Sequence, residues 1–221
     1  MKKILIIIFI SIALSSCKYK PISSYCMCGP SNIDIENAAI SSIGANSTEE
    51  EIKTALENNR NQTGKNIIAV TGHVDNTSTV FDNIKNALQN ETDIILDLSG
   101  ATFETSYTFT LEGTSALTTV LLPPIQQITA GFFKDCTSLV NIQIPSTVVK
   151  IDNTSFENCT SLKNVEYLGT SPNAVTASPF TSASTTDLYL PNVSSNPNDN
   201  SWDNFLNVSW TSVHYGVSMT Y

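Results

Sequence analysis

Hydrophobic positions along the chain recur with a period of about 23 residues. The first column has members spaced 24, 22, 23 and 23 residues apart: Leu96, Val120, Ile142, Val165 and Leu188. A second column lies two residues further on, at Leu98, Leu122, Ile144, Tyr167 and Leu190. A third contains Phe109, Phe133, Phe156 and Phe180. Three columns that keep step over roughly a hundred residues indicate an internal repeat.

Each repeat contains a short alternation of apolar and polar residues, which predicts a strand with one buried face. One repeat alone cannot bury that face, whereas stacked repeats pair their strands and bury the columns as one core. Pro123, Pro145 and Pro191 follow three of these strands and end them, because proline lacks the N–H that a strand donates. The pattern predicts an α/β solenoid of about five coils, with the repeats over residues 93–186. Residues 187–221 are expected to form the last strand and a C-terminal cap.

Residues 47–92 are predicted to form a helix–strand–helix cap on the first repeat. Ser47 and Glu50 have the spacing of a capping box, and residues 67–70 read as a strand. Thr79 with Asp82 could cap the second helix. The buried faces are expected at Ile52, Ala55 and Leu56 in the first helix and at Phe81, Ile84 and Leu88 in the second. Together with the strand at Leu96, this arrangement predicts a βαβ unit.

The start of the chain has the pattern of an export signal. Lys2 and Lys3 precede an apolar run over residues 4–14, which is too short to span a bilayer as a helix. The following Leu14-Ser15-Ser16-Cys17 resembles the bacterial lipobox, which implies cleavage after residue 16 and a lipid such as palmitate on Cys17. The alternative is an ordinary signal peptide with a nearby cysteine. Residues 17–46 are then expected to be a tether from a membrane-anchored Cys17.

The composition argues against several partners. Removing Lys2 and Lys3 changes the net charge from −9 to −11, which opposes binding to nucleic acid. Cys26 and Cys28 form a pair too isolated for zinc, which requires four ligands, so they are expected to be free thiols or a local disulfide. Cys136 and Cys159 share one repeat position and are expected to be small buried groups. We expect no metal and no cofactor.

Residues 133–145 read Phe-x-x-Cys-x-x-Leu-x-x-Ile-x-Ile-Pro, and the first part of this pattern returns at Phe156. This stretch resembles the BspA-like class of leucine-rich repeat, and the resemblance extends over about residues 65–210, with a degenerate repeat at 169–186. The resemblance implies a surface lipoprotein of the spirochaete or Bacteroidetes type, with adhesion to host-matrix proteins or other bacteria. It also implies a place in the cell envelope, in the outer membrane and exposed at the surface. Sequence alone leaves the membrane leaflet open.

Catalytic patterns are missing from the sequence, and we predict that the chain is not an enzyme. Histidine occurs only at His73 and His214, at opposite ends of the predicted array. The sequence contains no nucleophile motif, zinc-protease motif or phosphate-binding loop. Residues 72–75, around His73, are more typical of a loop than of a site.

Residues between the buried columns are predicted to face outward and to form a candidate binding face. One row contains Asp97, Leu121, Gln143, Glu166 and Tyr189, and a flanking row contains Thr119, Asn141, Asn164 and Asp187. Two functions remain open: a lipid-anchored binding or adhesion module that uses this face, and a structural envelope lipoprotein with no external ligand.

Overall fold

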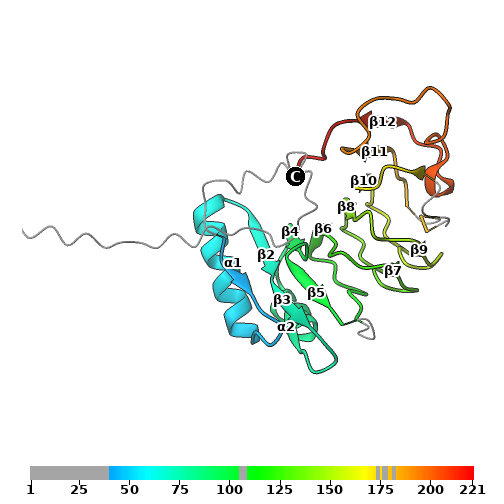
Figure 1. The fold of residues 1–221 in the computed structure, drawn as a ribbon. Helices are drawn as coiled ribbons and strands as arrows, with labels where there is room; N and C mark the ends of the chain where they lie inside the picture. Colours follow the sequence, from blue (N-terminus) through cyan, green and yellow to red (C-terminus); the bar gives the residue numbers. More distant parts are fainter. Residues whose placement is uncertain (1–39, 105–108, 173–174, 176–178, 181–182) are drawn as a thin grey trace, which may run out of the picture.

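The computed structural model describes residues 40–104, 109–172, 175, 179–180 and 183–221. Within these residues, eight parallel strands form one sheet in the order β1-β2-β4-β6-β8-β10-β11-β12. The strands are β1 (Ser42–Ile43), β2 (Asn66–Val70), β4 (Ile94–Asp97), β6 (Leu117–Leu121), β8 (Asn141–Ile144), β10 (Asn164–Tyr167), β11 (Asp187–Leu190) and β12 (Ser212–Tyr215). They follow one another along an arc (Figure 1). A mostly parallel sheet of this kind fits a repeat α/β fold.

The strand registers confirm the first hydrophobic column. Leu96 pairs with Val120, Val120 with Ile142, Ile142 with Val165, and Val165 with Leu188. All five side chains are fully buried. The second column, from Leu98 to Leu190, is buried on the same side of the sheet. The period in the sequence therefore corresponds to the step from one strand to the next.

The phenylalanine column forms a stack at the other side of the core. The rings of Phe133 and Phe156 stack with centroids 5.0 Å apart, and Phe156 lies 4.9 Å from Phe180. Phe109 contacts Phe132 rather than Phe133 and also stacks on Phe81, at 3.8 Å. This last contact joins the repeats to the N-terminal part of the chain.

Helix α1 (Glu49–Thr63) begins one residue later than the sequence suggested. Thr48, not Ser47, is the N-cap: its hydroxyl accepts a hydrogen bond from the Glu51 N–H, and the Glu51 carboxylate accepts one from the Thr48 N–H at 2.8 Å. The expected pair of Ser47 and Glu50 is wrong because the neighbouring Thr48 and Glu51 have the same spacing. The predicted buried stripe of α1 is confirmed.

Helix α2 (Val80–Ala87) follows Thr79, which makes no side-chain cap hydrogen bond. The expected cap at Thr79 is therefore wrong; its hydroxyl instead accepts a hydrogen bond from the side chain of Asn83. The residues predicted to face inward from α2, Phe81, Ile84 and Leu88, are buried. Strands β2 and β4, which flank α2 in the sequence, pair in parallel as a βαβ unit requires.

Two smaller parallel sheets lie beside the main one. The first pairs β3 (Gly72–Val74) with β5 (Ala101–Phe103), and the second pairs β7 (Gln127–Ile128) with β9 (Lys150–Ile151). The loop predicted at residues 72–75 is thus partly a strand. Its three residues are too few to show a period in the sequence.

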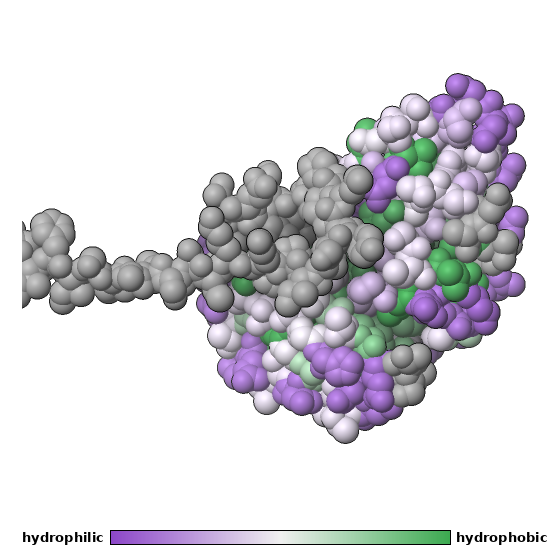
Figure 2. Space-filling model, viewed as in Figure 1, coloured by the Kyte–Doolittle hydropathy of each residue, from purple (hydrophilic) through white to green (hydrophobic). Residues whose placement is uncertain are grey.

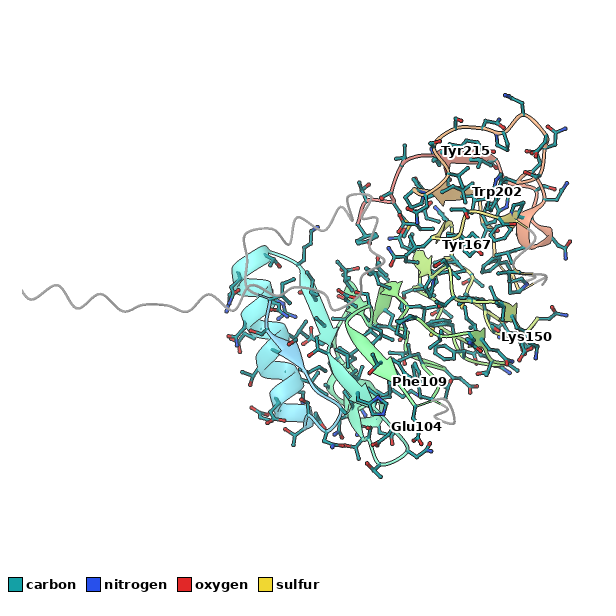
Figure 3. All side chains as sticks on the ribbon, viewed as in Figure 1. Glu104, Phe109, Lys150, Tyr167, Trp202 and Tyr215 are labelled. Carbon is teal, nitrogen blue, oxygen red and sulfur yellow. The ribbon has the colours of Figure 1, made fainter. Side chains whose placement is uncertain are left out.

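Aromatic side chains cover the far end of the sheet. Trp202 and Phe205 pack on Tyr167, with ring centroids 6.1 and 4.9 Å away, and Figure 3 labels Tyr167 and Trp202 at this end. Phe205 begins a short 3-10 helix, η2 (Phe205–Asn207). The chain then forms β12, so β11 is not the last strand as the repeat spacing suggested.

Candidate binding face

The face of the sheet opposite the core carries two rows of side chains in strand register. The first row runs through Thr119, Asn141, Asn164 and Asp187, and the second through Asp97, Leu121, Gln143, Glu166 and Tyr189. We call these nine residues the ladder face. The sequence placed the nine residues in the correct two rows because side chains alternate between the faces of a strand.

The first row is a chain of hydrogen bonds between neighbouring strands. The side-chain amide of Asn164 donates to the Asn141 side-chain oxygen at 2.7 Å, and the Asn141 amide donates to the Thr119 hydroxyl at 2.9 Å. At the other end, Asp187 lies 2.9 Å from the Nε2 atom of His214 on β12. Hydrogen bonds to His214 and Thr186 hold the pKa of Asp187 below its usual value.

The second row contains a buried carboxylate. Glu166 is 1% exposed, and one of its carboxylate oxygens accepts a hydrogen bond from the Gln143 amide at 2.7 Å. Its other oxygen accepts one from the backbone N–H of Met219 at 3.1 Å. Burial raises the pKa of Glu166, although these hydrogen bonds and one from the Ser218 side chain lower it. Burial likewise raises the pKa of Asp97, against hydrogen bonds from Ser99.

Residues 217–221, which we call the tail segment, lie across the ladder face. The ring of Tyr221 packs against a small cluster of Ile67, Ile95 and Leu121, one residue from each of β2, β4 and β6. The Lys65 amine donates to the backbone oxygen of Tyr221 at 2.7 Å. In Figure 1 the C-terminus lies on the inner side of the arc of strands. The tail segment thus returns from β12 to the opposite end of the sheet.

This placement corrects the expectation that the ladder face is exposed. Four of its nine residues are buried: Thr119 at 2%, Leu121 at 4%, Gln143 at 7% and Glu166 at 1% exposure. The other five, Asp97, Asn141, Asn164, Asp187 and Tyr189, are partly exposed. Strand alternation indicates which face a side chain occupies but gives no information about an irregular segment that covers this face.

The more accessible part of the ladder face lies at the β10–β12 end. There the ring of Tyr189 stacks on the imidazole of His214, with centroids 4.4 Å apart, and both are partly exposed. The sequence interpretation missed His214 as a member of this face. Its register with Tyr189 could be found only by recognising β12, which lies outside the regular repeat spacing. On the side shown in Figure 2, residues of intermediate hydropathy separate smaller hydrophilic and hydrophobic patches.

The two described cysteines are buried and protonated. The Cys159 thiol donates to the Phe133 carbonyl at 3.0 Å, and the Cys136 thiol donates to the Leu111 carbonyl at 3.1 Å. Burial raises the pKa of each thiol to about 12. A nucleophilic cysteine requires the opposite shift, so these side chains serve packing. Cys17, Cys26 and Cys28 lie outside the described residues.

Other functional features were searched in the described part of the chain. It contains no cluster of three or more histidine, cysteine or acidic residues that could hold a metal ion. None of its helices is long and apolar enough to cross a membrane. His73 on β3 contacts the Thr102 hydroxyl at 3.2 Å, far in sequence and sheet from His214.

Comparison with known proteins identifies the repeats. The family model of the BspA type leucine rich repeat region matches residues 105–220 with six copies. The chain belongs to this family. The match confirms the resemblance found in the sequence and extends it through β11 and β12. No curated protein and no solved structure matches the chain. The family is a binding or structural class of repeat that is not known for enzymes, and a leucine-rich repeat domain suggests a protein-binding or adhesion-type module.

Proposed function

We propose that this protein is a lipid-anchored module of the bacterial cell surface that binds another protein through the ladder face. The observation that carries the proposal is the family membership of residues 105–220, together with a sheet face of partly exposed polar and aromatic side chains. Tyr189 is the expected anchor, because aromatic residues often dominate interface energy and its ring is held against His214.

The proposal includes an organisation of the whole chain. Residues 1–16 are a signal peptide, Cys17 carries the lipid, and residues 17–46 are a tether. Residues 47–92 cap a short solenoid of repeats over 93–186, and residues 187–221 close it. The contact of Phe81 on α2 with Phe109 supports the cap, since it covers the apolar end of the phenylalanine stack. We propose an extracellular or host-matrix protein as partner and an outer-membrane location.

Surface exposure is tested by protease treatment of intact cells. The account expects the protein to be degraded on intact cells, while a periplasmic control protein survives. Replacing Cys17 with Ala should release the protein from the membrane fraction and abolish its labelling with a fatty acid. Labelling that persists in the Cys17→Ala variant would exclude Cys17 as the attachment site.

A structural envelope lipoprotein is the second candidate. It is favoured by one observation, the burial of Leu121, Gln143 and Glu166 beneath or beside the tail segment, which leaves less of the sheet accessible to a partner. Resistance of the protein to protease on intact cells would support this second candidate.

A further inference from the structure

The tail segment occupies the ladder face as a peptide ligand would. It crosses from β10, where Ser218 and Met219 contact Glu166, to β2, where Lys65 holds the backbone oxygen of Tyr221. Ser218 and Met219 are buried, and no residue of the tail segment belongs to a helix or strand. Its grip on the sheet therefore consists of backbone and side-chain contacts to a face that the rest of the chain has already formed.

The contacts of the tail segment define two subsites. The carboxylate of Glu166 accepts from one backbone N–H and from one hydroxyl side chain, and Gln143 holds this carboxylate in place. Three positions after Ser218, the apolar cluster of Ile67, Ile95 and Leu121 receives an aromatic ring. An extended peptide with the same spacing of hydroxyl and ring can make both contacts.

The resident side chain fits the apolar subsite imperfectly. The hydroxyl of Tyr221 is buried and has no hydrogen-bond partner within the described residues. Burial and the carboxyl groups of Glu166 and Asp97 raise the pKa of this phenol. An unpaired buried hydroxyl weakens binding, so a phenylalanine ring would suit the cluster better than tyrosine. The tail segment, Val-Ser-Met-Thr-Tyr, also carries no charged side chain, and the two carboxyl groups disfavour an acidic ligand.

We propose that the ladder face is a docking site for an extended, non-acidic peptide segment of a partner protein, with Ser or Thr three positions before a phenylalanine. The tail segment is the resident occupant that such a peptide displaces. The inference rests on the proposed function, in which the chain binds another protein. It adds the chemical class of the ligand and an internal competitor for the same site.

The test uses the full chain in mild detergent and a fluorescent peptide, Val-Ser-Met-Thr-Phe. A second form of the chain carries Met219→Pro and Tyr221→Ala, which remove the N–H bonded to Glu166 and the ring from the apolar cluster. Circular dichroism checks that both forms are folded. The control peptide, Val-Ser-Met-Thr-Ala, lacks the ring.

We expect the phenylalanine peptide to bind the double variant about tenfold more tightly than it binds the parent, because the competing segment is weakened. We also expect it to bind the double variant about tenfold more tightly than the alanine peptide does. Adding Leu121→Asp to the double variant should abolish the difference between the two peptides.

Equal binding of the two peptides to the folded double variant, or equal affinity of the parent and the double variant for the phenylalanine peptide, would overturn the inference. Binding of the intact chain to matrix proteins or cells is measured separately. If the chain binds them and the phenylalanine peptide neither binds nor competes, the docking site is wrong while the proposed function stands.

Discussion

The Gln143 side-chain amide and the Glu166 carboxylate form a buried hydrogen bond of 2.7 Å between adjacent strands. Each side chain occupies the same position of its repeat, because Gln143 and Glu166 are partners in the register of β8 and β10. This pair connects the repeat pattern to the tail segment, since the second carboxylate oxygen holds Met219. The following predictions begin from it.

Replacing Gln143 with Leu should lower the free energy of unfolding by about 1–3 kcal/mol, because one oxygen of the buried Glu166 then loses its donor. Urea denaturation measures the change. Gln126, which is exposed, provides the control, and Gln126→Leu should change stability by less than about 0.5 kcal/mol. Equal effects of the two substitutions would show that the hydrogen bond is not a stabilising contact.

The raised pKa of Glu166 predicts a dependence of stability on pH. The folded protein binds the Glu166 proton more tightly than the unfolded chain, so this group's contribution is present below the ordinary glutamate pKa and is lost as pH rises through the raised pKa. Glu166→Gln should remove this loss, so that variant and parent differ most at the upper end of the range. Thermal melts from about pH 4 to pH 7 measure it, since the ordinary pKa of Glu is about 4.3. Parallel curves for both proteins would contradict the shift.

The phenylalanine stack predicts a large loss from a single truncation. Phe156 is fully buried between Phe133 and Phe180, so Phe156→Ala should cost about 3–5 kcal/mol of unfolding free energy. Val149, which is 60% exposed, is the matched surface position, and Val149→Ala should have little effect. A loss below about 1 kcal/mol for Phe156→Ala would mean that the ring is not a core contact.

Gly169 predicts a steric effect specific to one turn. A Cβ atom at this position would overlap the ring of Tyr167, so Gly169→Ala should destabilise the fold by about 1–3 kcal/mol. Gly44 has open space around its Cα and a backbone that any residue adopts, so Gly44→Ala serves as the control. Thermal melts that leave both variants equal to the parent would show that the Tyr167 ring moves aside freely.

The sequence predicted the repeats well because the core columns are a direct consequence of strand pairing. Leu96 and Val120 had to be apolar for the sheet to bury one face, and their spacing carried over into the register. Helix starts were less certain, since Ser47 and Thr48 offer the same cap chemistry at adjacent positions. The chain therefore contained the information on the core but not a unique boundary for α1.

The candidate site was predicted only in part. The alternation of polar and apolar residues located the ladder face, yet β12 escaped notice because it follows a long segment with no repeat spacing. The tail segment has no period either, so its contact with Glu166 could not be found from pattern. That contact joins residues 53 positions apart and depends on the folded sheet.

The central claim is that the ladder face binds a partner protein, and one binding measurement tests it most directly. Residues 18–221 and a Tyr189→Asp variant are assayed against immobilised host-matrix proteins and bacterial cell surfaces, with Val149→Asp as a control away from the ladder face. The account predicts that the parent and Val149→Asp bind alike, while folded Tyr189→Asp loses about tenfold or more in affinity. Undiminished binding by folded Tyr189→Asp would contradict the claim.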